Sequence, residues 1–189
     1  GGGSADCAAT LKGLAQLWGL NISVYDLNQL GLKLGSDIPI CLHGQTAFMS
    51  GTGENIKVAP TLPSFWLVLV NPGVKLSTST VFKANKKFQY KNWSQPGEFS
   101  DSPKTTKDLA CLLYDRRNDL TDAAISLQPV ISNVLKTLQA SDGVLLTRMS
   151  GSGATCFGMF NDFNQARTAA RNISLNHPNW WVCPTPVNK

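Results

Sequence analysis

Three short runs of small residues in this chain have the composition of ligand-binding loops. The first, Gly1-Gly2-Gly3-Ser4-Ala5, leads into the apolar-periodic segment from Cys7 to Trp18. Glycine lets backbone N–H groups approach a ligand closely, and the N-terminus of a helix attracts anions. The run therefore predicts a phosphate-binding loop in which Ser4 caps the following helix. A flexible linker of glycine and serine would have the same composition, so this alternative stays open.

The second and third runs also point to phosphate chemistry. In Gly35-Ser36-Asp37-Ile38-Pro39 a carboxylate follows directly after a predicted helix. Asp37 could orient or deprotonate a reacting hydroxyl, although an aspartate at the start of a short helix is commonly only an N-cap. The third run, Gly151-Ser152-Gly153, lies between two apolar segments. Three such runs in one chain predict a cleft that handles phosphate groups.

Length and composition favour a folded protein that binds a small anion. The chain has 189 residues, of which 42% are hydrophobic, and its formal net charge is +5. This length suits one domain or two small ones, with enough apolar residues for a core. The basic residues are scattered, with one loose cluster formed by Lys83, Lys86, Lys87 and Lys91. This surplus suits an anionic small ligand at least as well as a nucleic acid, so no nucleic-acid partner is expected.

The cysteines and histidines do not form a metal-binding pattern. The five cysteines are widely spaced and include no C-x-x-C pair, which favours reduced thiols in a cytosolic protein. His43 and His177 are too few and too far from acidic clusters to suggest a zinc site. No apolar run reaches the roughly 18–20 residues that a membrane span requires, and no secretory leader is visible. We therefore expect a cytoplasmic protein with no structural metal and no membrane partner.

The elements that must position the three runs can be read from the apolar periodicity. Helices are predicted over residues 8–18, 24–34, 106–114, 120–127, 130–138 and 163–175, and a short helix capped by Ser77 or Thr78 runs through Val81 and Phe82. Gly19 is expected to end the first helix, and Ser23 with Asp26 gives the second a capping-box pattern. Pro39 suits the first turn of a further short helix. The inward residues expected in the last helix are Ala166, Ala169, Ala170 and Ile173. Strands are predicted over residues 46–49, 56–59, 65–70, 144–146, 155–160 and 180–183. The first two are expected to form a hairpin with residues 50–54 as its loop, and Asn71-Pro72-Gly73 is expected to turn the chain after the third. Residues 85–103 show little periodicity and are expected to form a surface excursion.

A domain boundary is expected at Pro60-Thr61-Leu62-Pro63, because an apolar strand of the kind buried on both faces follows it. This gives domains over residues 1–62 and 63–189. The second part reads strand, helices, strand, strand, helix, strand, which is the order of a ferredoxin-like α+β sandwich.

Several segments resemble the GHMP kinases, the superfamily of galactokinase, homoserine kinase, mevalonate kinase and phosphomevalonate kinase. The segment from Gly1 to Leu11 resembles the end of their second signature, and the segment from Arg148 to Phe157 resembles their third. Within the superfamily, residues 34–39, 73–82, 118–120 and 177–182 are similar to the 4-diphosphocytidyl-2-C-methyl-D-erythritol kinases of the non-mevalonate isoprenoid pathway. The similarity spans nearly the whole chain, in the same order.

The resemblance implies a fold, an activity and a set of site residues. The fold is the two-domain GHMP kinase fold, with the end of a ribosomal-protein-like N-terminal domain followed by a ferredoxin-like C-terminal domain. The activity is ATP-dependent phosphorylation of the 2-hydroxyl of 4-diphosphocytidyl-2-C-methyl-D-erythritol, with Mg²⁺ accompanying the nucleotide, in a bacterial enzyme that is a monomer or a homodimer. The implied roles are Asp37 as the catalytic residue, Thr78 and Phe82 as substrate-binding residues with Phe82 stacked on the cytosine, and Gly1, Gly2, Gly3, Ser4, Ala5, Gly151, Ser152 and Gly153 as ATP-binding residues.

One departure from the family pattern concerns the start of the chain. The family begins with a strand carrying a lysine motif, and its glycine loop is preceded by further glycines, none of which occurs here. The chain therefore resembles the C-terminal two thirds of such a kinase, and we expect it to be incomplete for activity. Two alternatives remain: another GHMP kinase that acts on a different alcohol, and a non-catalytic basic module that binds RNA or protein. The absence of interleaved basic and aromatic residues disfavours the RNA-binding module.

Overall fold

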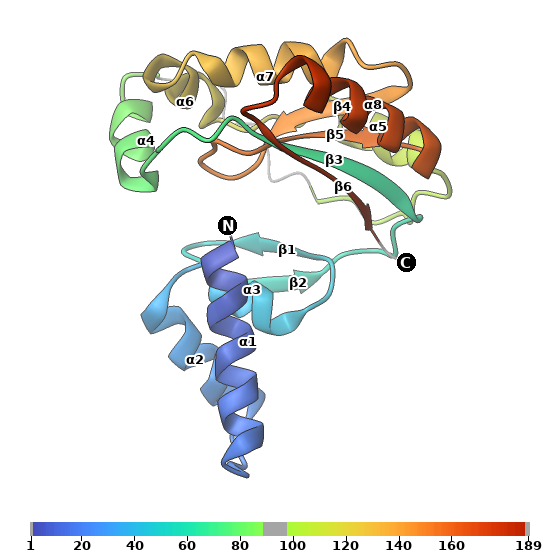
Figure 1. The fold of residues 1–189 in the computed structure, drawn as a ribbon. Coiled ribbons are helices and arrows are strands. Elements are labelled where there is room, and N and C mark those ends of the chain that lie inside the picture. The colour runs from blue at the N-terminus through green and yellow to red at the C-terminus, as the bar shows by residue number, and fades with distance from the viewer. Residues whose placement is uncertain (1, 89–97, 188–189) are drawn as a thin grey trace. The chain divides into compact units, whose positions relative to one another are not determined.

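A computed structural model of the protein describes residues 2–88 and 98–187 (Figure 1). The chain divides into two compact units. The first comprises Gly1–Thr61 together with Glu98–Asp101, and the second comprises Leu62–Gly97 together with Ser102–Lys189. Both units combine helices and strands, and the fold class is α+β.

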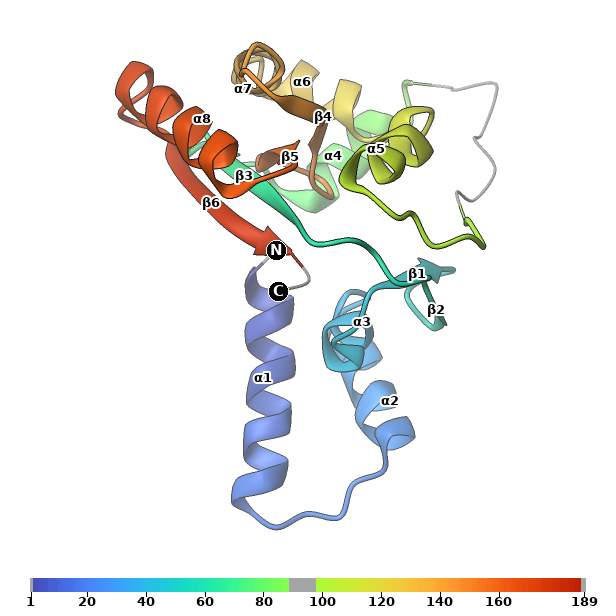
Figure 2. The same ribbon diagram turned by 90° about the vertical axis from the view of Figure 1, so that its right-hand side faces the viewer.

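In the described part of the first unit, three helices are followed along the chain by a β-hairpin (Figure 2). These elements are α1 (Gly2–Leu17), α2 (Val24–Leu34), α3 (Ile38–His43), β1 (Ala47–Ser50) and β2 (Asn55–Val58). A small core forms where α1 meets α3, with Ala8, Ile38 and Leu42 buried. The Ser23 cap predicted for the second helix is confirmed, because the Ser23 hydroxyl accepts a hydrogen bond from the backbone N–H of Asp26. The Asp26 carboxylate accepts in turn from the Ser23 hydroxyl at 2.7 Å.

The start of α1 corrects the sequence prediction. The helix was expected to begin after a glycine loop capped by Ser4, but it already includes Gly2, and Ser4 lies inside its first turn. Glycine adopts helical dihedral angles as well as others, so a glycine run next to a strong apolar repeat can extend the helix. The predicted end of the helix is confirmed, since Gly19 follows in the left-handed conformation with φ of 61°.

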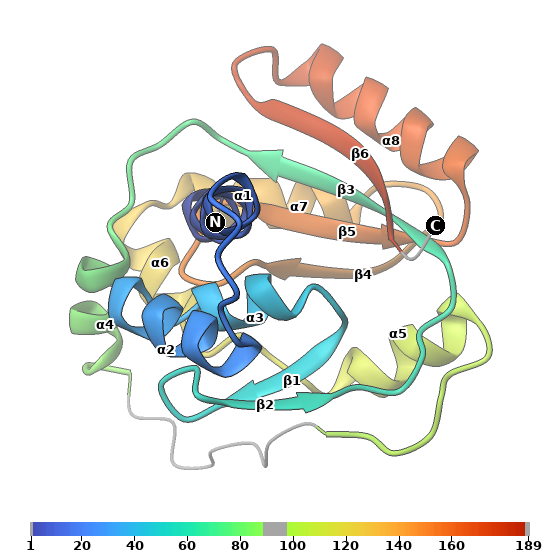
Figure 3. The same cartoon turned by 90° about the horizontal axis from the view of Figure 1, so that it is seen from below.

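The second unit is built on a four-stranded antiparallel sheet whose strands run in the order β4-β5-β3-β6 (Figure 3). The strands are β3 (Phe65–Asn71), β4 (Val144–Met149), β5 (Cys156–Phe160) and β6 (Trp181–Val187). The central position of the first strand, between the third and the fourth, is the arrangement of the ferredoxin-like sandwich predicted from the element order. Pro184 and Pro186 lie on the edge strand β6, where a missing N–H is tolerated and discourages pairing with another chain.

Among the described residues, the helices that accompany this sheet are α4 (Thr78–Asn85), α5 (Thr106–Tyr114), α6 (Thr121–Leu127), α7 (Val130–Gln139) and α8 (Phe163–Asn176). Helix α7 packs on β4 and β5, and α8 packs on β3 and β6, with both helices on one face of the sheet (Figure 1). The four inward residues predicted for α8 are all buried, namely Ala166, Ala169, Ala170 and Ile173. Fully buried Val68, Phe160 and Leu138 join the sheet to this helical layer.

The predicted excursion over residues 85–103 is only partly described, because residues 89–97 lie outside the described ranges. Its last part belongs to the first unit. Glu98 forms an ion pair with Lys57 of β2, and the Phe99 ring meets the Phe48 ring edge-on at 5.2 Å. The residues in these two contacts are 41 and 51 positions apart, so periodicity could not indicate them. None of the described helices is long and apolar enough to cross a membrane.

Candidate functional site

Asp37 lies in the tight connection between α2 and α3, at the N-cap position of α3. Gly35 ends α2, and Pro39 occupies the first turn of α3 as predicted. Within the described residues, the Asp37 carboxylate makes no capping hydrogen bond to α3, and the side chain is exposed. The capping interpretation of this aspartate therefore has no support in the structure. The carboxylate can accept a proton or a hydrogen bond from a ligand.

The β1–β2 turn packs against the connection that carries Asp37. Gly53 is buried in this turn with φ of 110°, and a Cβ atom built there would overlap the carbonyl oxygen of Ser36. The turn is closed by Glu54, whose carboxylate accepts hydrogen bonds from the backbone N–H of Thr52 at 2.6 Å and from its hydroxyl at 2.8 Å. The main chain next to Asp37 thus rests directly on the main chain of a glycine. Sequence reasoning identified this turn only as a hairpin loop.

The other predicted site residues of the first unit are at the start of α1. Gly2, Gly3, Ser4 and Ala5 form the first turn, with Gly1 outside the described residues. Gly2 and Gly3 are exposed. The first four N–H groups of an α-helix have no partner within the helix. The predicted phosphate loop is therefore replaced by a helix N-terminus, which still offers backbone donors to an anion.

In the second unit, Gly151, Ser152 and Gly153 lie in the loop that joins β4 to β5. The backbone N–H of Ser150 donates to the carbonyl of Thr155, and that of Gly153 donates to the carbonyl of Ser150, each at 2.9 Å. Gly151 and Gly153 both have positive φ, which side-chain-bearing residues rarely adopt. A Cβ at Gly153 would approach the Met149 sulfur to 2.9 Å, so the inner side of the loop is also tightly packed.

The structure brings two of the predicted residues of this unit together. The hydroxyls of Thr78, at the start of α4, and Ser152 lie 2.9 Å apart and share a hydrogen bond. Phe82 lies one turn further along α4, and 55% of it is exposed. Phe82 is not a core aromatic of α4, because the adjacent Val81 fills that position and is fully buried. An exposed ring beside a hydroxyl pair is suited to stacking on a planar ligand.

Sequence reasoning missed the residues that hold these segments. Gly53 was predicted only as part of a hairpin loop. Asn71 was predicted as part of an Asn-Pro-Gly turn, and in the structure its amide also donates a hydrogen bond to Thr155 Oγ1 at 2.9 Å. Asn118 gave a family-like motif without an assigned role. Among the described residues, no group of three His, Cys, Asp or Glu side chains could hold a metal ion.

Two models of one protein family match the chain. The model of the GHMP kinases N terminal domain matches residues 1–45, and the model GHMP kinases C terminal matches residues 101–179. The N-terminal match contains the Asp37 segment, and the C-terminal match contains the β4–β5 loop. They also fall on the first and second units, respectively, apart from Asp101, which belongs to the first unit.

Curated relatives named 4-diphosphocytidyl-2-C-methyl-D-erythritol kinase are similar to nearly the whole chain. The relative from Paramagnetospirillum magneticum is 48% identical over 187 residues, which cover 99% of this chain and 64% of the relative. The relative from Anaplasma marginale (strain Florida) is 42% identical over 191 residues, covering 100% of this chain and 63% of the relative. The chain thus spans a little less than two thirds of the length of these relatives.

Solved structures agree with the sequence comparison. A crystal structure of 4-(cytidine 5'-diphospho)-2C-methyl-D-erythritol kinase superposes with a TM-score of 0.70 at 29% identity, covering 97% of this chain and 65% of that one. Homoserine kinase from Cytophaga hutchinsonii has the same fold, with a TM-score of 0.71 at 16% identity over 98% of this chain and 64% of its own. Both halves of one fold are matched in order, and the chain belongs to the GHMP kinase family.

Proposed function

We propose that this chain is part of a kinase that transfers the γ-phosphoryl group of ATP to the 2-hydroxyl of 4-diphosphocytidyl-2-C-methyl-D-erythritol, a step in non-mevalonate isoprenoid synthesis. The observation that carries the proposal is the 48% identity, over 99% of this chain, with a relative of that name. The exposed, uncapped carboxylate of Asp37 supplies a group suited to the reaction.

In this proposal Asp37 acts on the hydroxyl that is phosphorylated. The substrate oxygen attacks the γ-phosphorus, the bond from that phosphorus to the β–γ bridging oxygen breaks, and ADP leaves. The hydroxyl proton passes to the Asp37 carboxylate. Phosphoryl transfer requires mainly positioning and charge stabilisation, so one well-placed carboxylate and several phosphate-binding N–H groups are an adequate protein contribution.

The remaining residues bind the two substrates. Gly1, Gly2, Gly3, Ser4 and Ala5 at the start of α1, together with Gly151, Ser152 and Gly153 of the β4–β5 loop, would bind the ATP phosphates. Phe82 would stack on the cytosine, with Thr78 beside it. The support for the last assignment is the outward position of Phe82 and the short hydroxyl contact of Thr78. Mg²⁺ would arrive with the nucleotide, since it commonly binds through substrate phosphates with few carboxylates, and it would neutralise phosphate charge.

The proposal is tested by measuring ADP release from the intact protein with three acceptor alcohols: 4-diphosphocytidyl-2-C-methyl-D-erythritol, mevalonate and homoserine. We expect turnover with the first alone. Replacing Asp37→Asn should lower kcat by about 10²–10⁴, the range for loss of a general base. Its melting temperature should stay near that of the wild type, because the carboxylate makes no capping bond.

Two results would contradict the proposal. Turnover with mevalonate or homoserine in place of the cytidine substrate would assign the protein to another branch of the GHMP kinases. Normal turnover of the Asp37→Asn protein, combined with a lower melting temperature, would make Asp37 a structural cap instead.

A further inference from the structure

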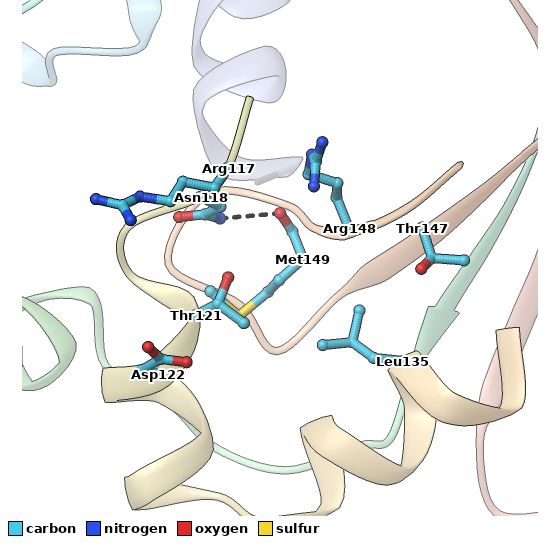
Figure 4. A pocket seen from close by; sticks show the side chains of 8 residues that line it. All are labelled: Arg117, Asn118, Thr121, Asp122, Leu135, Thr147, Arg148 and Met149. Carbon is cyan, nitrogen blue, oxygen red and sulfur yellow. Dashed lines mark hydrogen bonds between the residues drawn. The ribbon is translucent and has the colours of Figure 1, made fainter. Parts of the chain in front are cut away.

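The connection between α5 and α6 carries a side chain that holds the β4–β5 loop. The Nδ2 group of Asn118 donates hydrogen bonds to the carbonyl oxygens of Met149 at 2.9 Å and Gly151 at 2.7 Å. Figure 4 shows the Asn118 amide directed at Met149, while Arg117 extends away from it. Met149 is the last residue of β4, and Gly151 lies in the loop. A single amide therefore spans the point where the strand becomes the loop.

All the hydrogen-bonding groups of the Asn118 side chain are engaged. Its Oδ1 accepts a hydrogen bond from the backbone N–H of Leu120 at 3.0 Å, and this closes a turn at the N-cap of α6. The side chain thus needs one acceptor and two donors on a short stem. Among the standard amino acids, asparagine alone supplies these groups at this length.

Packing does not hold the outer part of the loop. Gly151 is exposed, and a Cβ atom built on it would meet no described heavy atom within 4 Å beyond its chain neighbours. At the far end of the loop, Asn71 donates from Nδ2 to Thr155 Oγ1 and accepts at Oδ1 from the backbone N–H of Gly73 at 2.8 Å. One asparagine therefore braces each end of the loop, and Asn118 is the one that reaches its exposed glycine.

We propose that Asn118 is a positioning residue for nucleotide binding, because it fixes the backbone of Gly151 and, through it, the place of Ser152. Asn118 acts through the loop and does not itself touch the nucleotide. The inference rests on the proposed function, in which Gly151, Ser152 and Gly153 meet the ATP phosphates. A loose loop must be ordered when the nucleotide binds, and this ordering costs about 0.5–1.5 kcal/mol for each immobilised side chain, which is roughly 2- to 10-fold in affinity, so a loosened loop would lower affinity measurably.

The test compares Asn118→Asp and Asn118→Ala in the intact protein. The aspartate keeps the acceptor for Leu120 but turns a carboxylate oxygen toward two carbonyl oxygens, and the alanine removes the brace without adding charge. Amide hydrogen exchange is followed at Ser150 and Gly153, whose N–H groups are bonded within the loop, and ATP affinity is measured by titration calorimetry. The matched control is Asn172→Asp, which adds the same charge at an exposed position of α8.

We expect both Asn118 variants to exchange at Ser150 and Gly153 about tenfold faster or more, with protection of β3 unchanged. They should bind ATP roughly 2- to 10-fold more weakly, because the loosened loop must be ordered on binding. The Asn172 variant should match the wild type in both measurements. Unchanged exchange in the loop overturns the inference, whatever the ATP affinity. Faster exchange with unchanged ATP affinity upholds the brace and instead refutes the proposed role of this loop in binding ATP.

Discussion

At the scale of single residues, Gly53 shows how a position without a side chain can hold the segment that carries Asp37. Its φ of 110° is rarely adopted by other residues, and any Cβ atom there would overlap the carbonyl oxygen of Ser36. Replacing Gly53→Ala should therefore displace the Ser36–Asp37 main chain. If Asp37 acts on the substrate hydroxyl, kcat of the intact kinase should fall about 10- to 100-fold.

Gly51 provides the control for this prediction, since it lies in the same turn with φ of 72°. The three atoms nearest to a Cβ at Gly51 all belong to the Glu54 carboxylate, the far end of a side chain that can rotate. Alanine at position 51 would adopt a left-handed conformation that costs about 1–2 kcal/mol, and the atoms nearest to its Cβ are not those of the Asp37 segment. Steady-state kinetics and thermal melts give kcat and the melting temperature of both variants, and only Gly53→Ala should show the large loss in kcat. Equal kcat in the two variants would show that Gly53 serves only the turn.

Phe82 is the second residue whose role depends on its surroundings. Stacking of a base on an aromatic ring is worth about 1–3 kcal/mol, so Phe82→Ala should raise the KM for the cytidine substrate roughly 5- to 150-fold and leave the KM for ATP unchanged. The melting temperature should change little, because the ring is largely exposed.

The matched control is Phe163, another exposed ring, which packs on Trp66 with the ring centroids 4.7 Å apart. Phe163→Ala should leave both KM values unchanged. Equal losses for both substrates in Phe82→Ala would contradict the stacking role.

At the scale of elements, the start of α4 and the β4–β5 loop are joined by the hydroxyl pair of Thr78 and Ser152. The two residues are 74 positions apart, so this hydrogen bond joins two segments that are distant in the sequence. A double-mutant cycle with Thr78→Val and Ser152→Ala should give a coupling free energy of unfolding of about 0.5–1.5 kcal/mol. Urea titrations of the four proteins measure it. Strictly additive losses would mean that the hydroxyls are neighbours without a stabilising bond.

At the scale of the whole molecule, the two units differ greatly in the size of their cores. In the first unit the core cluster holds three buried apolar residues, whereas that of the second extends from the sheet to α7 and α8. Local stability follows the buried apolar area. We expect the first unit to unfold at a lower urea concentration than the second. The reactivity of the free cysteine thiols toward a labelling reagent can measure this difference.

Cys41 packs against the small core, and Cys156 lies fully buried in the large one. Burial raises the pKa of Cys156 to about 12, so at pH 8 it reacts with a thiol reagent only after unfolding restores a pKa near 8.5. Because the folded state keeps this thiol protonated, its stability is unaffected by the thiol below pH about 8.5 and falls as the pH rises from there to about 12. Mass spectrometry of pulse-labelled protein should find Cys41 modified at lower urea than Cys156. Exposed Cys111 should react throughout and controls for the reagent. Simultaneous labelling of Cys41 and Cys156 would mean that the units unfold as one.

The sequence by itself determined the elements and their type. Apolar periodicity predicted the helices and strands, because a helix or a strand must bury one stripe or one face, and local signals fixed several ends. Ser23 with Asp26 began α2, and Gly19 ended α1. The ferredoxin-like order of the second unit followed from the succession of elements. The three small-residue runs and Asp37 could be picked out for the same reason, since glycine and an isolated carboxylate stand out against an apolar repeat.

Only the tertiary structure decided what those residues contact. It showed that Gly2 to Ala5 continue into α1, that Phe82 faces outward while Val81 is buried, and that Asp37 does not cap α3. It also identified Gly53 against Ser36 and Asn118 against Gly151. Each of these contacts joins segments distant in the chain or depends on which of two neighbouring residues is turned inward. Periodicity reports the face that is buried, but the partner on that face is fixed only when the elements pack.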